Sequence, residues 1–224
     1  MRFTEELKGY TKEIWEAYDV HPFIQGLEKG DLPIEKFQFY MIQDYLYLWD
    51  YAKLFALGAL KCEKKEWISS FAQSMDLTLN GEMGIHRGYM KRLGISLEEA
   101  EETEMDFLNR SYTNYMLSVS QKGGYEEVVA ALLSCAWTYA EIANGIHKRN
   151  PKAKDHPFYG EWILGYTSKE FQEGAQKYIK QMDEIGKYLS PERKEYLKEV
   201  FRVCCLYELK FWDMAYFEGS EGER

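Results

Sequence analysis

The sequence predicts an all-α fold, and three observations support this prediction. Apolar residues recur at steps of three and four along most of the chain, as they do on one face of a helix. The alternation of polar and apolar residues that is typical of strands is nearly absent. The chain has 224 residues, 46% of them hydrophobic, and no break in composition, so it can bury one sizeable core. We therefore expect one multi-helical bundle domain over residues 1–218, followed by a disordered tail, residues 219–224.

The N-terminal part is expected to contain two helical segments and then a long helix. Apolar residues at positions 3, 7, 10 and 14 mark the first helix from Phe3, and His21-Pro22 closes the segment that follows it. The turn residues Gly30–Pro33 then interrupt the chain. The apolar spacing resumes directly after them and continues, which predicts a helix over residues 34–61.

One long helix and one short helix are expected next. The long one covers residues 65–93, and Gly94 would end it. Ser96 and Glu99 stand three residues apart before an acidic run, which is the pattern of a capping box at the start of a helix. We interpret the acidic run as a solvated helix face.

Turn signals also divide the second half of the chain. Gly123-Gly124 separates two helices, residues 150–157 form a polar loop bounded by prolines, and Ser168 is a predicted N-cap. Ser190-Pro191-Glu192 is a typical opening of a helix. The expected helices cover residues 107–122, 125–148, 158–166, 168–189 and 190–217.

Composition argues against several classes of partner. Asp and Glu outnumber Lys and Arg by 37 to 28, giving a formal charge of −9, and the basic clusters that bind nucleic acid are absent. No uncharged apolar run approaches the roughly 20 residues that cross a bilayer, and the first residues are charged where a signal peptide would be apolar. The four cysteines show no CxxC spacing, which favours reduced thiols in the cytoplasm.

Three predicted helices each carry one reactive side chain on the face that apolar spacing assigns to the core. Asp44 continues the apolar series at positions 37, 41, 48, 51 and 55, and Glu208 continues the series at 201, 204, 211 and 215. Cys135 lies on the face marked by positions 128, 132, 139, 142 and 146. A carboxylate removed from water must find partners or shift its pKa. Two inward acids and a thiol therefore predict a reactive pocket.

Each of these side chains also has an interpretation without chemistry. A lone cysteine on the apolar face of a helix most often serves packing. Asp44 could be satisfied by a backbone donor or by a neighbouring tyrosine. Glu208 could form a buried salt bridge.

Glu82 and His86, one helical turn apart, fall on the apolar face of their own helix. Such a pair is most often a hydrogen bond within the core, and metal ligation is the alternative. Together with Asp44 or Glu208 it would support a second hypothesis, a di-iron helical oxidase. Di-iron bundles favour Glu and His three residues apart, and these are four apart, so the spacing fits poorly.

Several motifs and one late acid resemble a known family. They are His21-Pro22-Phe23, Gly30-Asp31-Leu32, Gln43-Asp44-Tyr45-Leu46-Tyr47, Cys135-Ala136-Trp137-Thr138-Tyr139-Ala140-Glu141, Trp162-Ile163-Leu164-Gly165-Tyr166 and Glu208. In this order they resemble the TenA family, the thiaminase II or aminopyrimidine aminohydrolase group, over almost the whole chain. The resemblance implies a heme-oxygenase-like helical fold without heme, assembled as a homotetramer.

The resemblance also implies an activity and a set of site residues. An aminomethyl-pyrimidine, or thiamin itself, would react with water to give the hydroxymethyl-pyrimidine, as in thiamin salvage. Cys135 would be the nucleophile, Asp44 would bind the ring nitrogen and amine, and Glu208 would be the acid or base near the leaving group. Four tyrosines would complete the pocket, namely Tyr47, Tyr112, Tyr139 and Tyr166. This chemistry needs neither a metal nor an organic cofactor.

A third hypothesis is a noncatalytic binding or regulatory protein that holds a pyrimidine in an aromatic pocket, which the same tyrosines would permit. A binding protein needs no nucleophile, so Cys135 discriminates between binding and hydrolysis.

Overall fold

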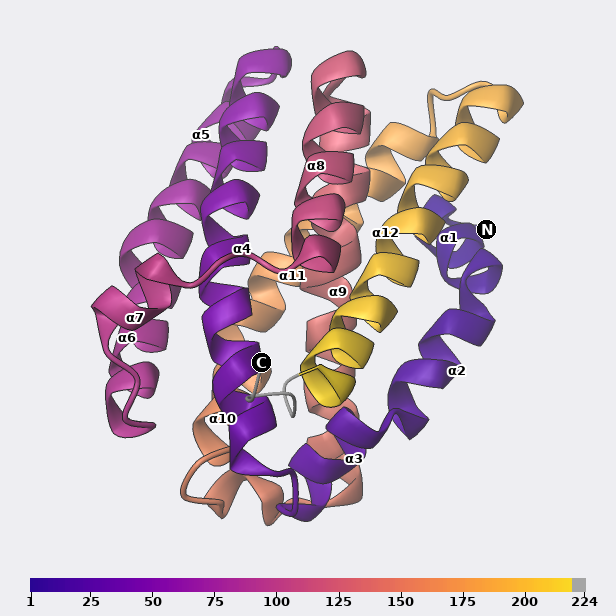
Figure 1. Ribbon diagram of the computed structural model, residues 1–224. Coiled ribbons are helices and arrows are strands. Elements are labelled where there is room, and N and C mark those ends of the chain that lie inside the picture. Colours follow the sequence, from indigo (N-terminus) through magenta and orange to yellow (C-terminus); the bar gives the residue numbers. More distant parts are fainter. Residues whose placement is uncertain (219–224) are drawn as a thin grey trace. The chain divides into compact units, whose positions relative to one another are not determined.

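The computed structural model describes residues 1–218, and within them every regular element is a helix (Figure 1). The predicted all-α fold is confirmed, whereas the predicted tail, residues 219–224, lies outside the described residues. Two compact units divide the chain, one made of Met1–Pro33 and Val129–Tyr216 and the other mainly of Ile34–Val128. The single domain expected over residues 1–218 stays a prediction. Within residues 1–218, no helix is both long and apolar enough to cross a membrane.

The first unit contains helices from both ends of the sequence. Helix α9 begins in the second unit, and its greater part, from Val129 onward, belongs to the first. The helices are α1 (Phe3–Tyr10), α2 (Lys12–Val20), α3 (Pro22–Lys29), α9 (Tyr125–Arg149), the 3-10 turn η2 (Ala153–Asp155), α10 (Gly160–Thr167), α11 (Lys169–Gly186) and α12 (Pro191–Phe217).

The first predicted helix, which included position 14, is in fact divided at Thr11. The backbone N–H and the hydroxyl of Thr11 both donate to the Leu7 carbonyl, at 3.1 and 3.0 Å. A threonine side chain that bonds the backbone one turn earlier competes with regular helix formation. Thr11 has φ −106° and ψ 11°, so α1 ends and α2 begins in a new direction.

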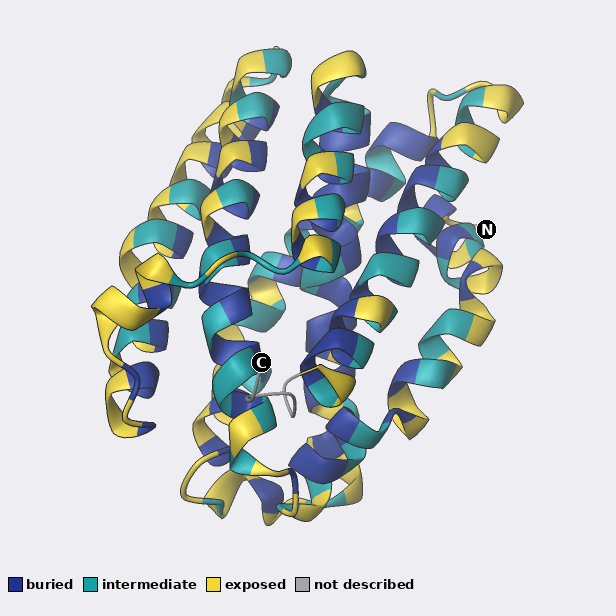
Figure 2. Ribbon diagram, viewed as in Figure 1, coloured by how far each residue is buried: buried dark blue, intermediate teal, exposed yellow. Residues whose placement is uncertain are grey.

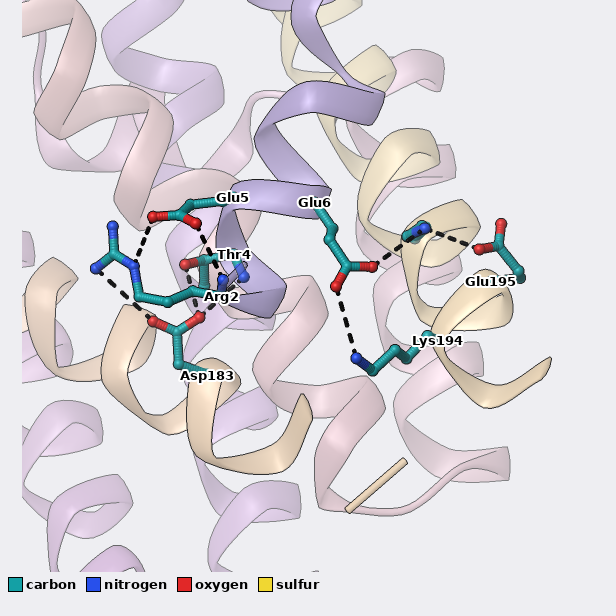
Figure 3. A network of polar contacts seen from close by, with 8 residues as sticks. Arg2, Thr4, Glu5, Glu6, Asp183, Lys194 and Glu195 are labelled. Atoms are coloured by element: carbon teal, nitrogen blue, oxygen red, sulfur yellow. Dashed lines mark hydrogen bonds and ion pairs between the residues drawn. The ribbon is translucent and has the colours of Figure 1, made fainter. Parts of the chain in front are cut away.

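Polar contacts hold α1 against α11 and α12, as Figure 3 shows. The backbone N–H and hydroxyl of Thr4 donate to Asp183 Oδ1 on α11, at 2.9 and 2.7 Å. Lys194 and Lys198 of α12 form ion pairs with Glu6, at 3.6 and 3.4 Å. The N-terminal helix is therefore an integral part of the first unit.

Local signals set the ends of α3. His21 is its N-cap, with Nδ1 accepting the Phe23 N–H, and Pro22 occupies the first helical position. Gly30 ends the helix in the left-handed region with φ 77°, where a Cβ would also lie 2.8 Å from the His156 ring. Only glycine meets both conditions without strain.

The second unit is built around its longest helix. Helix α4 packs against α5, α6, α7 and α8, and buried residues occur on several of its faces (Figure 2). Its observed bounds agree with the predicted helix over residues 34–61. The elements are α4 (Ile34–Lys61), α5 (Lys65–Asp76), the π-helical turn η1 (Leu77–Glu82), α6 (Met83–Arg92), α7 (Leu97–Glu102) and α8 (Phe107–Lys122).

The single helix predicted over residues 65–93 is interrupted by the π-helical turn η1. Its hydrogen bonds run to the fifth residue back, as in the bond from the Met83 N–H to the Thr78 carbonyl. A π turn accommodates an extra residue and changes the face that the following helix presents. The turn therefore helps to set the orientation of α6, which carries His86.

Gln43 joins α4 to the start of α8. The Asn109 side-chain amide donates to the Gln43 backbone carbonyl at 2.7 Å, and the Asp106 N–H donates to Gln43 Oε1 at 2.9 Å. Gln43 and Asn109 are both buried, so these bonds are shielded from water. The side chains on α4 and α8 are held in a defined register.

Candidate functional site

Asp44 lies on α4 in the second unit and is only 4% exposed. Its Oδ2 atom lies 2.7 Å from His86 Nε2 on α6 and accepts a hydrogen bond of 3.3 Å from the Tyr40 hydroxyl. The predicted inward direction of Asp44 is confirmed, and a tyrosine is indeed one of its donors. Its shorter contact, to His86, was not predicted as a hydrogen bond.

His86 is 5% exposed, and both of its ring nitrogens contact protein oxygens. Nδ1 lies 3.0 Å from the Glu82 backbone carbonyl, and Nε2 contacts Asp44. Burial by itself would lower the pKa of His86. The hydrogen bond and charge of Asp44, together with the charge of Glu82, outweigh burial, and the pKa of His86 is raised.

Two of the predicted substrate-binding tyrosines meet in the second unit. The rings of Tyr47 on α4 and Tyr112 on α8 lie with their centroids 5.5 Å apart at an interplanar angle of 31°. Tyr47 also stacks on Tyr51 at 5.4 Å, and its hydroxyl contacts Met116 Sδ at 3.8 Å. These three tyrosine rings form a buried aromatic cluster, and two of them lie on α4, the helix that carries Asp44.

The other two predicted tyrosines meet in the first unit. The centroids of Tyr139 on α9 and Tyr166 on α10 are 4.9 Å apart, and both rings contact Trp162. Cys135 precedes Tyr139 by one turn of α9 and is half-buried, not fully enclosed. Cys135 therefore keeps some exposure, unlike the fully buried Cys204 and Cys205.

Glu208 lies on α12 in the first unit and is 2% exposed. Its charge acts on neighbouring buried groups. Burial is the main cause that raises the pKa of Cys205 and of the Tyr18 hydroxyl, and the negative charge of Glu208 raises both further. The Tyr18 hydroxyl donates to the Cys205 backbone carbonyl at 2.5 Å. The predicted inward direction of Glu208 is confirmed.

The candidate residues are thus placed in two sets. Asp44, Tyr47 and Tyr112 belong to the second unit, and the first unit holds Cys135, Tyr139, Tyr166 and Glu208. The expectation that both sets act on one substrate ring stays a prediction. Within the described part of the chain, no group of three or more His, Cys, Asp or Glu side chains is arranged to hold a metal ion.

Solved structures define the class of fold. A domain from Shewanella denitrificans OS217, described as having a heme oxygenase-like fold, aligns with a TM-score of 0.77 at 13% identity, covering 99% of this chain and 97% of its own. A TenA homologue from P. horikoshii OT3 aligns with a TM-score of 0.89 at 30% identity, covering 98% of this chain and all of its own. The predicted heme-oxygenase-like helical fold is confirmed.

The chain belongs to the TENA/THI-4/PQQC family, which matches residues 10–218. A relative from Halalkalibacterium halodurans is 49% identical over 218 residues, covering 97% of each chain. A relative from Helicobacter pylori is 42% identical over 216 residues, covering 96% of this chain and 99% of its own. Both relatives are named aminopyrimidine aminohydrolase. The resemblance identified from the sequence motifs is confirmed.

Proposed function

We propose that this protein is an aminopyrimidine aminohydrolase of thiamin salvage. It converts the aminomethyl-pyrimidine, thiamin itself, or both, to the hydroxymethyl-pyrimidine with water. The observation that carries the proposal is the 49% identity, over nearly the full length of both chains, to a relative of that name. The buried carboxylates of Asp44 and Glu208 support it, because such groups suit acid and base catalysis.

The proposed reaction begins at the pyrimidine ring. Direct displacement at the methylene carbon is slow, but addition of the Cys135 thiolate to the adjacent ring position lets the ring electrons expel ammonia or thiazole. Water adds to the exocyclic methylene that results, and departure of the thiolate restores the aromatic ring. The half-burial of Cys135 supports this role, since a nucleophile must be reachable.

The other roles follow from the charge that each group carries. We assign to Asp44 the binding of the ring nitrogen and exocyclic amine, and to Glu208 the proton transfers at the leaving group. Tyr47, Tyr112 and the Tyr139–Tyr166 pair would bind and orient the ring. Aromatic faces with polar edges suit a flat heterocycle.

A Cys135→Ser variant tests the covalent step. We expect it to fold and to bind the aminopyrimidine, while ammonia release falls by about a thousandfold or more. Cys62→Ser is the matched control, because the Cys62 thiol donates a hydrogen bond to the Lys64 carbonyl and we assign it no role in the reaction. Ammonia release from the aminopyrimidine and thiazole release from thiamin would be measured side by side to rank the substrates.

Two outcomes would contradict the proposal. Turnover by Cys135→Ser at the wild-type rate would remove the covalent step. Tight binding of the aminopyrimidine by the wild-type protein, with the ligand unchanged after long incubation, would indicate a binding protein instead of a hydrolase.

We also propose a homotetramer and a cytoplasmic location. The free thiols of Cys62, Cys204 and Cys205 support a reducing compartment, since disulfides are rare there. Light scattering of the eluted protein would measure the mass of the assembly, and a monomer would contradict the first of these proposals.

A further inference from the structure

The buried pair of His86 and Asp44 holds a proton whose position follows from the acceptors around it. A backbone carbonyl can only accept a hydrogen bond, so the contact to Glu82 requires a proton on His86 Nδ1. The other nitrogen, Nε2, lies 2.7 Å from Asp44 Oδ2, which is the usual length of a bond from an imidazolium to a carboxylate. With protons on both nitrogens, His86 is charged and the pair is neutral overall.

The groups that face His86 favour this state. Asp44 and the Tyr40 hydroxyl approach from α4, and Glu82 lies one turn earlier in η1. Helix α7, which also packs against α6, carries four glutamates, yet within residues 1–218 the hydrogen bonds of His86 and the charges that shift its pKa come from Asp44 and Glu82. Both of these acids raise the pKa of His86.

The Asp44 carboxylate keeps one oxygen for a ligand. Within residues 1–218, both hydrogen bonds to the Asp44 side chain end on Oδ2. Oδ1 is not among the buried side-chain atoms of the described residues that lack a hydrogen-bond partner, so water or a ligand can reach it. Oδ1 is therefore suited to a donor on a bound molecule, and His86 sets its direction by holding Oδ2.

We propose that His86 is a positioning residue, which supplies, through Asp44, the proton that the pyrimidine ring nitrogen takes up. This proposal rests on the function proposed above. As the bond from Cys135 sulfur to ring carbon forms, the electron pair of the ring C=N bond moves to the nitrogen. The proton on His86 Nε2 moves to Asp44, and Asp44 passes a proton to the ring nitrogen, which leaves His86 neutral and Asp44 again a carboxylate. When sulfur departs and the ring becomes aromatic again, the proton returns to His86 by the same route.

Nitrogen-15 NMR of the wild-type protein without substrate tests the proton directly. At about pH 8, an ordinary histidine with a pKa of about 6.5 has one bare ring nitrogen. We expect both ring nitrogens of His86 to be protonated at that pH. A bare Nε2 at this pH would overturn the proposal, whatever the activity of the protein.

Kinetics of two variants test the transfer. His86→Gln keeps an N–H donor toward Asp44 but has no proton to release. We expect kcat for the aminopyrimidine to fall by about a hundredfold or more, with KM close to the wild-type value. Tyr40→Phe is the matched control, because it removes the longer bond to the same Oδ2 atom and leaves His86 in place. Its kcat should fall by less than about tenfold.

The pH profile separates proton supply from a structural role. In the wild type, kcat should fall at high pH as His86 loses its proton, and His86→Gln should lack this dependence. His86→Gln with the wild-type kcat, or with the wild-type pH profile on a lowered kcat, would overturn the proposal. A wild-type protein that hydrolyses neither substrate would overturn the proposed function, and the NMR experiment would still report the proton on Nε2.

Discussion

Helices α4 and α5 approach closely at Gly58, and a methyl group there should destabilise the second unit. An ideal Cβ on Gly58 would lie 2.8 to 2.9 Å from three carbons of the buried Phe71 ring. Because carbon atoms in contact normally lie about 3.5 to 4.0 Å apart, the ring must retreat by more than about half an ångström in a packed core. Such overpacking costs roughly 1–3 kcal/mol. The change from glycine to alanine within a helix stabilises the helix by about 1 kcal/mol. The free energy of unfolding of Gly58→Ala should therefore be lower than that of the wild type by roughly 0–2 kcal/mol.

A second alanine variant isolates the steric cost. Gly88 is exposed within α6, and its Cβ would meet only the flexible end of Arg92, at 4.0 Å. Gly88→Ala should therefore gain about 1 kcal/mol. The difference between the two variants is the cost of moving Phe71, since helix propensity contributes equally to both.

Urea unfolding followed by circular dichroism would measure both free energies, with m-values compared to confirm that the same structure unfolds. Adding Phe71→Leu to Gly58→Ala should recover part of the loss, because leucine lacks the ring carbons that clash. Equal stability of the two alanine variants would refute the reasoning.

Two further predictions concern helix N-termini in the first unit. Burial, opposed by Asp213, lowers the pKa of His21, whose Nδ1 accepts the Phe23 N–H at 3.2 Å. Neutral His21 therefore contributes fully to the stability of the folded protein above the pKa of about 6.5 that histidine has in the unfolded chain. This contribution is lost as the pH falls through the lower pKa of His21 in the folded protein. The stability advantage of the wild type over His21→Asn should shrink between about pH 8 and about pH 5 in urea unfolding, and a constant difference would contradict this. Ser168 Oγ accepts a hydrogen bond from the Phe171 N–H at 3.2 Å. Ser168→Ala should therefore lower the free energy of unfolding by about 1 kcal/mol, whereas Ser168→Asp, which can still cap the helix, should not. An alanine variant as stable as the wild type would contradict the capping role.

Features with a local cause could be predicted from the sequence. The bounds of α4 agree with the predicted residues 34–61 because the preceding break is encoded nearby, in Gly30 with its positive φ and in Pro33. The capping box of α7 formed as predicted, with the Glu99 N–H donating to Ser96 Oγ at 3.0 Å. In each case the responsible residues lie within one or two turns of the feature.

Some helix boundaries were predicted wrongly because the residues that set them carry no recognised start or stop signal. Helix α10 begins at Gly160 instead of residue 158, because the N–H groups of Phe158 and Tyr159 both donate to His156 Nδ1 at 3.2 Å and stay in a turn. The π-helical turn η1 has no comparable signal, since its residues fit the apolar spacing of an ordinary helix. A helical period of 3.6 residues cannot reveal where one residue has been added.

The candidate site was also predicted only in part from the sequence. Spacing alone predicted that Asp44 and Glu208 point inward, since burial follows from the face on which a residue lies. Spacing could not pair Asp44 with His86, because 42 residues separate them and the pairing depends on the packing of α6 on α4. The sequence did place His86 one turn from Glu82, and the observed contact there is to the Glu82 backbone carbonyl.

Stability alone does not account for the Asp44–His86 pair. Removing two charges from water costs about as much as their attraction returns, and apolar side chains of similar volume commonly replace such pairs without loss. An acid buried only for packing would also have both oxygens satisfied by the protein, whereas Asp44 Oδ1 is not among the buried unpartnered atoms of the described residues and can be reached by a ligand. In the described chain the hydrogen bonds to Asp44 fall on Oδ2, on the side of His86 and Tyr40. The arrangement makes physical sense once a ligand with a donor group completes the carboxylate at Oδ1, which is the position that we assign to the amine of the aminopyrimidine.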